Sequence, residues 1–169
     1  MSLSHLEHRA VSPQSVNCAV ITISDSRTEA DDESGKLYKE QLSQHGHKIL
    51  AYALLKNDPA AIRQKISEFL KLDGLQVIIT SGGTGLSKRD VTIETVTPML
   101  EKTMDGFGEL FRSLSYQDIG TSSILSRAAA GVIQGKLILS LPGSLGATRL
   151  ALEKIILPEI GHAVRETTR

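Results

Sequence analysis

Cysteine is nearly absent from this sequence. Cys18 is the single one among 169 residues, which excludes an internal disulfide framework and a zinc site built from several cysteines. It lies in the apolar run VNCAVITI, where we expect a buried, inert thiol rather than a reactive one.

Aromatic residues and net charge are also scarce. Three Tyr, three Phe and no Trp leave little material for stacking platforms that bind single-stranded nucleic acid or sugar. Nineteen basic and nineteen acidic residues balance, so long-range attraction to nucleic acid or to an anionic membrane is not expected. We therefore expect no nucleic acid and no membrane as a partner, and any polyanionic ligand must be held by local contacts.

Long apolar runs are missing as well. No stretch reaches the length needed to span a membrane, and no apolar signal-peptide region follows the polar start, so a cytoplasmic protein is expected. Residues 1–15 mix polar and charged residues without a period, which indicates a flexible N-terminal tail before a single domain at 16–169. His5 and His8 in this tail are expected to be solvated rather than to bind a metal.

Strand and helix patterns alternate through the first half of the chain. Apolar strand runs are predicted at 16–23, 49–55 and 77–79, each followed by a polar turn and a helical pattern. This alternation predicts a three-layer α/β fold with a mostly parallel, doubly wound sheet and right-handed crossovers.

The pattern changes after Pro98. A helix is predicted over 105–116, with an apolar face made of Phe107, Leu110, Phe111 and Leu114, and another over 122–130. The runs AAAGVI and KLILSL flank Gln134-Gly135, which predicts an antiparallel hairpin added to the sheet. A last helix over 150–157 is expected to break at Pro158.

The glycine-rich loop after the third strand is the strongest functional signal. Ser81, Gly82, Gly83, Thr84 and Gly85 form a loop in which main-chain N–H groups can converge, and a helix pattern starts just beyond it. The loop is neither a Walker A motif nor a dinucleotide fingerprint, and glycines at such turns also occur for purely steric reasons. The following Lys88-Arg89-Asp90 favours a phosphate site that also binds a cation, since a carboxylate beside an anion site needs one.

Polar residues follow the other strands too. Ser24 and Asp25, Asp58, and the turn Pro142-Gly143-Ser144 all come where a predicted strand ends, so they should share one rim with the glycine loop. A turn start accounts equally well for Asp25, and capping of a helix that begins at Pro59 accounts fully for Asp58. Two carboxylates at about 4 Å would repel by roughly 4 kcal/mol at an effective dielectric of 20, so a shared Mg²⁺ is the natural way to keep both ionised.

Three blocks of the sequence resemble a known family. TSGGTGLSKRDVTIE, DGFGELFRSLSYQDIGTSSILSRAAAG and LSLPGSLGATRLALEKIILPEIGH, in this order, closely resemble the MoaB/MogA family of molybdenum cofactor biosynthesis proteins. The resemblance covers roughly residues 16–162, and the second block is closer to MoaB. It implies a molybdopterin-binding-domain fold and molybdopterin adenylyltransfer, in which the terminal phosphate of molybdopterin attacks the α-phosphorus of ATP and pyrophosphate leaves.

The resemblance also implies roles for individual residues. Asp58 and Asp90 would be the acidic pair that holds Mg²⁺ and supports adenylyl transfer, and the loop 81–85 would receive phosphates of the pterin or the nucleotide. Asp25 and the turn 142–144 would complete the ligand wall. Glu94 would either face the site or complement the helix N-terminus.

Two alternatives stay open at this point. The protein is either an adenylyltransferase or a non-catalytic molybdopterin-binding or carrier protein of the same pathway; a nucleotide-processing relative of the competence-damage family ranks behind both. The resemblance further implies a homotrimer or hexamer and contacts with other proteins of the pathway. The face of Phe107, Phe111 and Leu114 is a candidate contact surface, although core packing explains it equally well.

Overall fold

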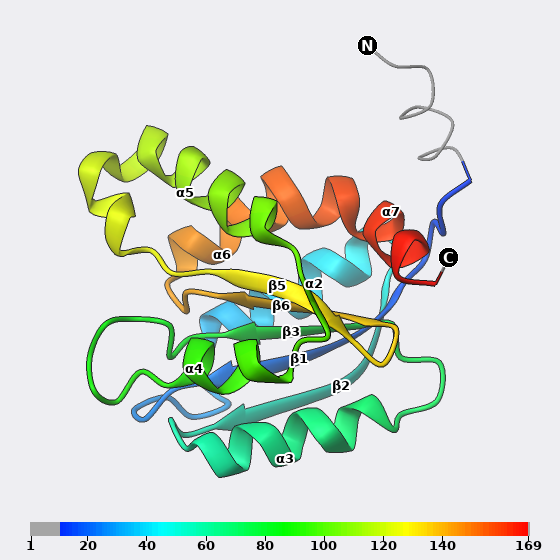
Figure 1. The fold of residues 1–169 in the computed structure, drawn as a ribbon, viewed down its shortest axis with the longest axis horizontal. Coiled ribbons are helices and arrows are strands. Elements are labelled where there is room, and N and C mark those ends of the chain that lie inside the picture. The colour runs from blue at the N-terminus through cyan, green and yellow to red at the C-terminus, as the bar shows by residue number, and fades with distance from the viewer. Residues whose placement is uncertain (1–10, 169) are drawn as a thin grey trace.

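A six-stranded sheet divides the molecule into three layers (Figure 1). The fold is a computed structural model that describes residues 11–168. Its strands are β1 (Asn17–Ile23), β2 (Lys48–Leu55), β3 (Val77–Ser81), β4 (Lys102–Thr103), β5 (Ala129–Ile133) and β6 (Lys136–Leu141). Most of the predicted tail, with His5 and His8, lies outside the described residues, whereas Ser15 is described and donates to the Gly46 carbonyl at 2.7 Å.

The strand order is β2-β1-β3-β6-β5-β4. β1 pairs in parallel with β2 and β3, and β3 pairs in parallel with β6, whereas β5 runs antiparallel to both β6 and β4. The β5–β6 turn has positive φ at Gln134 (51°) and Gly135 (71°), as a two-residue hairpin requires. The predicted mostly parallel sheet with an antiparallel hairpin is confirmed.

Helices cover both faces of the sheet. One face carries α2 (Glu33–Gln44), α5 (Asp105–Ile119), α6 (Leu145–Ala151) and α7 (Leu157–Thr167), and the other carries α3 (Pro59–Leu70) and α4 (Thr92–Val96) (Figure 1). The apolar strand residues alternate between two core clusters, one on each face. Because both faces are covered, the carboxyl ends of β1, β2, β3 and β6 are left at one open rim.

Two helix predictions in the second half are wrong. Residues 122–130 do not form a helix: a 3₁₀ segment spans Gly120–Leu125, and Ala129 onward pairs with β6 as strand β5. Alanine-rich segments suit a helix locally, but here pairing with β6 decides. Pro158 does not end the last helix either, because a π-helical turn at Leu152–Ile156 precedes it and α7 accommodates the proline in its first turn.

The apolar face of α5 belongs to the core rather than to the surface. Phe107 and Phe111 are 5% and 1% exposed, and Leu114 packs against the same core cluster. Of the two explanations left open for this face, core packing is the one that the structure shows. Leu110, predicted on the same face, is 47% exposed and stays outside the core.

Cys18 is fully buried in β1, as predicted. Burial raises the pKa of its thiol to about 12, so the thiolate is not populated near neutral pH. No helix within residues 11–168 is both long and apolar enough to cross a membrane.

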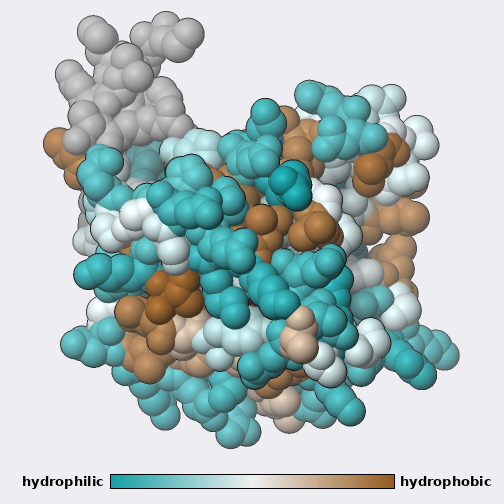
Figure 2. Space-filling model, turned by 180° about the vertical axis from the view of Figure 1, so that it is seen from behind, coloured by the Kyte–Doolittle hydropathy of each residue, from teal (hydrophilic) through white to brown (hydrophobic). Residues whose placement is uncertain are grey.

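Seen from behind, the molecule presents hydrophilic side chains over most of its surface (Figure 2). Hydrophobic side chains lie among them in several separate groups. Separate exposed apolar residues are ordinary for a folded protein, so this face does not by itself indicate a partner.

Candidate functional site

A cleft of about 470 Å³ opens at the rim where the parallel strands end. It contains most of the predicted site: Ser24, Asp25, Ser81, Gly82, Gly83, Thr84, Gly85, Asp90, Pro142 and Gly143. Asp58, Glu94 and Ser144 do not line it. The other lining residues are Thr22, Ile23, Ser26, Arg27, Asn57, Leu125 and Ser126.

The glycine loop follows β3 through positions that only glycine fits. Gly82 has φ of 104°, and a Cβ there would lie 2.2 Å from the carbonyl oxygen of Ile23. Gly83 has φ of 63°, and its Cβ would meet Asn57 Oδ1 at 2.3 Å. The loop therefore lies directly against the end of β1 and the segment after β2.

Main-chain N–H groups of this loop are left without acceptors. Gly82 N donates to the Leu141 carbonyl, but the N–H groups of Gly83, Thr84, Gly85 and Leu86 donate to no residue that the structure describes. Successive N–H groups without acceptors form an anion-binding concavity, and unmade hydrogen bonds are costly unless solvent or a ligand completes them.

The helix beyond the loop offers fewer free N–H donors to a ligand than its sequence pattern predicts. α4 is short, and the N–H of its first residue, Thr92, donates to the Gly83 carbonyl at 2.9 Å while its hydroxyl donates to the Gly82 carbonyl. Thr92 thus fixes the loop rather than offering that N–H to a ligand. The main-chain donors that remain available to an anion are therefore those of the loop itself.

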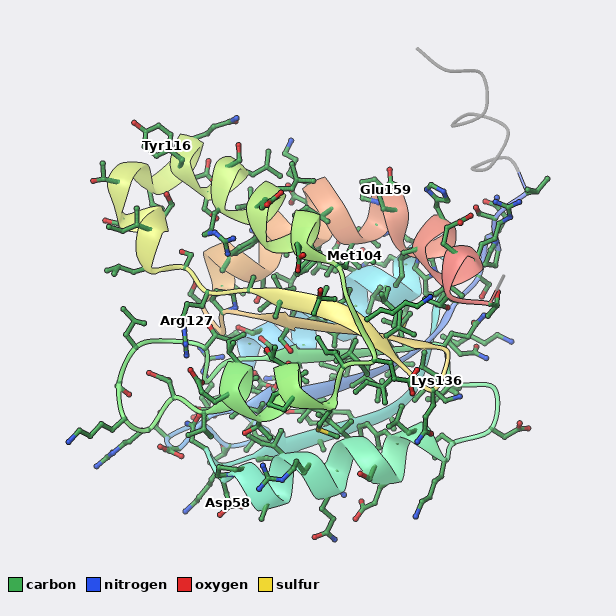
Figure 3. All side chains as sticks on the ribbon, viewed as in Figure 1. Asp58, Met104, Tyr116, Arg127, Lys136 and Glu159 are labelled. Atoms are coloured by element: carbon green, nitrogen blue, oxygen red, sulfur yellow. The ribbon has the colours of Figure 1, made fainter. Side chains whose placement is uncertain are left out.

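Arg127 holds the loop from outside the cleft. Its Nε donates to the Thr84 carbonyl at 2.7 Å, and one terminal nitrogen donates to the Gly85 carbonyl at 2.8 Å. In Figure 3, Arg127 reaches from the segment before β5 toward the loop after β3. Carbonyl and N–H point in opposite directions in a trans peptide, so turning these carbonyls toward Arg127 turns the N–H groups of Gly85 and Leu86 away from it.

Glu94 completes this arrangement by pairing with Arg127. Its two carboxylate oxygens accept from both terminal nitrogens of the guanidinium, and these hydrogen bonds lower the pKa of Glu94. Glu94 does not line the cleft. It stands in the first turn of α4, where a carboxylate complements the helix N-terminus, and from there it fixes Arg127.

In the described part of the chain, two carboxylates line the cleft, those of Asp25 and Asp90. Asp25 Oδ1 accepts the N–H of Asn57 at 2.9 Å, and this bond is the main reason that the Asp25 pKa lies below its usual value. Asp90 Oδ2 accepts the N–H of Ser87 at 3.1 Å and lies beside Gly85. Both side chains are therefore anchored by main-chain donors at the same rim.

Asp58 and Ser144 cap helices at the edge of the site. Asp58 Oδ1 accepts from Ala61 N at 2.7 Å and Ser144 Oγ accepts from Ala147 N at 3.3 Å. The second carboxylate oxygen of Asp58 accepts no hydrogen bond from a residue in the described part of the chain. Figure 3 shows Asp58 at the start of α3, at the same end of the molecule as Arg127.

The oxygen atoms around the cleft suit a hard cation shared with a ligand. Asn57 Oδ1 is buried and has no hydrogen-bond partner within residues 11–168, although the residue lines the cleft. Among the described residues, no group of three or more His, Cys, Asp or Glu side chains is placed to hold a metal. Mg²⁺ does not need such a cage, since it is commonly bound by one or two carboxylates together with substrate phosphates.

Sequence reasoning missed Arg27, Asn57 and Arg127. Arg127 lies in the SRAAAG block that helped to identify the family, but the helix expected there hid its role. Asn57 is adjacent to Asp58 in the sequence, and the helix-capping pattern identifies Asp58 but not Asn57. No pattern in the sequence distinguishes Arg27 from a solvated arginine in a loop.

Comparison with known proteins decides the family. A family model described as a probable molybdopterin binding domain matches residues 19–162. The chain belongs to this family. This match and the relatives described next confirm the predicted MoaB/MogA resemblance.

Relatives of this molybdopterin-binding domain match it from end to end. The molybdenum cofactor biosynthesis protein B of Bacillus cereus is 48% identical over 168 residues, which is 99% of each chain. A crystal structure of a molybdenum cofactor biosynthesis protein B, 49% identical, superposes with a TM-score of 0.90 over 94% of this chain and 99% of that one. The tungsten cofactor synthesizing protein MoaB of Pyrococcus furiosus is 36% identical, with a TM-score of 0.85 over 94% of this chain and 100% of its own.

Proposed function

We propose that this protein acts in molybdenum cofactor biosynthesis, binds molybdopterin in the rim cleft and adenylylates it with Mg-ATP. The observation that carries the proposal is the run of N–H groups from Gly83 to Leu86, which lack acceptors among the described residues and stand next to Asp90. Convergent main-chain donors beside a carboxylate fit a phosphate ligand that arrives with a cation. Family membership makes molybdopterin the phosphate-bearing ligand to test first.

The reaction joins two phosphates. An oxygen of the molybdopterin phosphate attacks the α-phosphorus of ATP, a new P–O–P linkage forms, and the bond between the α-phosphorus and its bridging oxygen to the β-phosphate breaks. Pyrophosphate leaves with that oxygen and its electron pair. Such a transfer needs positioning and charge neutralisation more than a protein nucleophile.

The chain's own residues supply that positioning. The N–H groups of Gly83 to Leu86 bind phosphate oxygens, while Arg127 and Thr92 keep the peptide planes of the loop in place. Asp90 would hold Mg²⁺ from inside the cleft, and Asp58 would join it through the carboxylate oxygen that does not cap α3. Bound Mg²⁺ would neutralise charge on the phosphates.

A carrier that binds molybdopterin without adenylylating it is the second candidate. The placement of Asp58 favours it, because Asp58 caps α3 and does not line the cleft. A carrier should bind molybdopterin with an affinity that ATP does not change, and it should not need the Asp58 charge.

An adenylylation assay separates the two. Purified protein is incubated with molybdopterin, Mg²⁺ and ATP, and adenylylated molybdopterin and pyrophosphate are measured. Asp58→Asn is the informative variant, since Asn caps a helix about as well as Asp and the substitution removes only the charge. Loss of product in Asp58→Asn and Asp90→Asn, with thermal stability and pterin binding retained, supports adenylyl transfer. If the wild-type protein binds pterin but gives no product, the result supports the carrier function instead.

We also propose that the chain assembles as a homotrimer or hexamer and contacts other proteins of the pathway. Light scattering on the purified protein decides the oligomeric state, and a monomeric mass at working concentration would contradict this proposal.

A further inference from the structure

Arg27 is the one basic side chain that lines the cleft among residues 11–168. The other charged lining residues are Asp25 and Asp90, so the cleft wall carries more negative than positive charge. A ligand with several phosphate charges needs a cation besides any Mg²⁺ held by these carboxylates. The position of Arg27 therefore has consequences for any anion that enters.

A buried carboxylate fixes the orientation of Arg27. One terminal nitrogen, Nη1, lies 3.4 Å from Asp32 Oδ1 and donates to Ser34 Oγ at 3.1 Å. Asp32 is 1% exposed and accepts shorter bonds from Thr22 and Tyr52, both at 2.6 Å. Asp32 is thus satisfied mainly by other donors, and its long contact with Arg27 serves to orient the guanidinium.

Most of the guanidinium remains available. Arginine carries five N–H donors, and the bonds to Asp32 and Ser34 both use Nη1. The Nε and Nη2 groups donate to no residue in the described part of the chain. The side chain is 31% exposed, so this free edge is partly shielded from water, where a charge-assisted bond is stronger than in bulk solvent.

Ser34 ties this cation to the turn after β6. Its hydroxyl donates to the Gly143 carbonyl at 2.8 Å, and Gly143 packs against Gly82 of the phosphate loop. The carboxylates are anchored elsewhere: Asp25 at Asn57 and Asp90 at Ser87. Different residues therefore fix the Arg27 guanidinium and the two carboxylates of the cleft.

We propose that the free edge of Arg27 binds an anionic phosphate of the ligand, so that Arg27 determines selectivity for highly charged phosphate ligands. This proposal rests on the proposed function, because it assigns a group within the same cleft. The phosphate comes from the nucleotide or from molybdopterin. A planar fork matches phosphate oxygens in a way that lysine does not.

The test compares ligand affinities of four proteins by titration calorimetry. Arg27→Gln removes the charge, Arg27→Lys keeps the charge without the fork, and Arg63→Gln changes an exposed arginine on α3 as the matched control. Each protein is titrated with ATP and AMP in the presence of Mg²⁺, and with molybdopterin. Arg27→Gln should lower the affinity for the ligand that Arg27 binds by about tenfold or more, because one charge-assisted hydrogen bond is lost. Arg27→Lys should lower this affinity less.

The pattern of losses identifies the phosphate. A loss confined to ATP, and larger than the loss for AMP, assigns Arg27 to the nucleotide phosphate chain; a loss confined to molybdopterin assigns it to the pterin phosphate. A general loss of structure would instead lower the affinity for all three ligands and lower the melting temperature of the variant. Equal affinities in wild type and both Arg27 variants overturn the inference alone, whereas a wild-type protein that binds none of the ligands overturns the proposed function with it.

Discussion

Replacing Arg127 by Gln should loosen the glycine loop without unfolding the protein. The substitution removes charged donors to the Thr84 and Gly85 carbonyls and the ion pair with Glu94. Hydrogen bonds from charged groups contribute about 1.5–3 kcal/mol each, and the lower end applies here because the side chain is 26% exposed. The ion pair with a 55% exposed Glu94 adds about 0.2–1 kcal/mol.

Because water can reach the freed carbonyls, we expect only about 1–2 kcal/mol of lost unfolding free energy. The larger effect should be on ATP affinity, which we expect to fall about tenfold since the N–H groups are no longer preoriented. The matched variant Glu94→Gln removes the ion pair but leaves both carbonyl bonds, and it should change affinity less than about threefold.

Calorimetric titration with Mg-ATP provides the measurement, and urea unfolding gives the stability of each variant. Weaker binding in Arg127→Gln, with near wild-type affinity in Glu94→Gln, is the expected result. The reasoning is refuted if Glu94→Gln weakens ATP binding as much as Arg127→Gln does, because the carbonyl bonds would then contribute nothing.

Further predictions concern the loop, pH and the thiol. Gly82→Ala should cost about 3 kcal/mol or more and abolish ligand binding, whereas Gly106→Ala, in open space on α5, should stabilise by up to about 1 kcal/mol in urea unfolding. Burial, with a smaller effect of His45, lowers the pKa of His47, so the folded state favours the neutral ring. The contribution of His47 to the free energy of unfolding is complete above its unfolded pKa of about 6.5 and is lost as pH falls through its lower folded pKa. Urea unfolding from pH 7.5 to 5 should show this loss, and His47→Asn, which can still accept from the main chain, should flatten it. Cys18 should resist a thiol reagent at pH 8 in the native protein and react once it is unfolded; rapid native labelling would contradict its burial.

Periodicity was sufficient for the first half of the fold because each strand there is a continuous apolar run. Burial on both faces makes the runs in β1 and β3 apolar, and local turn chemistry such as Asp58-Pro59 marks where the next helix begins. The helix predicted over 122–130 overlaps the first arm of the predicted hairpin. Alanine and serine fit a helix locally, but pairing with β6 across the Gln134-Gly135 turn makes Ala129 and Ala130 part of a strand. The break predicted at Pro158 does not occur because a π-helical turn, which helical periodicity does not reveal, precedes it and places the proline in the first turn of α7.

The site was predictable as a rim but not as a set of contacts. Strand ends and glycines placed the loop 81–85 and Asp90 together, since parallel strands end at the same edge. The hydrogen bonds from Arg127 to the loop span more than 40 residues of sequence, and the orientation of Arg27 depends on a buried Asp32 that looks like an ordinary member of an acidic loop. Such long-range polar contacts depend on the completed fold, so sequence patterns do not reveal them.

The stoichiometry of products in a single turnover tests most directly the proposal that the cleft transfers an adenylyl group. Wild-type protein in excess over molybdopterin, with Mg²⁺ and ATP, should give one adenylylated molybdopterin for each pyrophosphate, and pyrophosphate should not form when molybdopterin is left out. Asp90→Asn should bind molybdopterin and give neither product. Molybdopterin that is bound but recovered unchanged from the wild-type protein, with no pyrophosphate formed, would contradict the account.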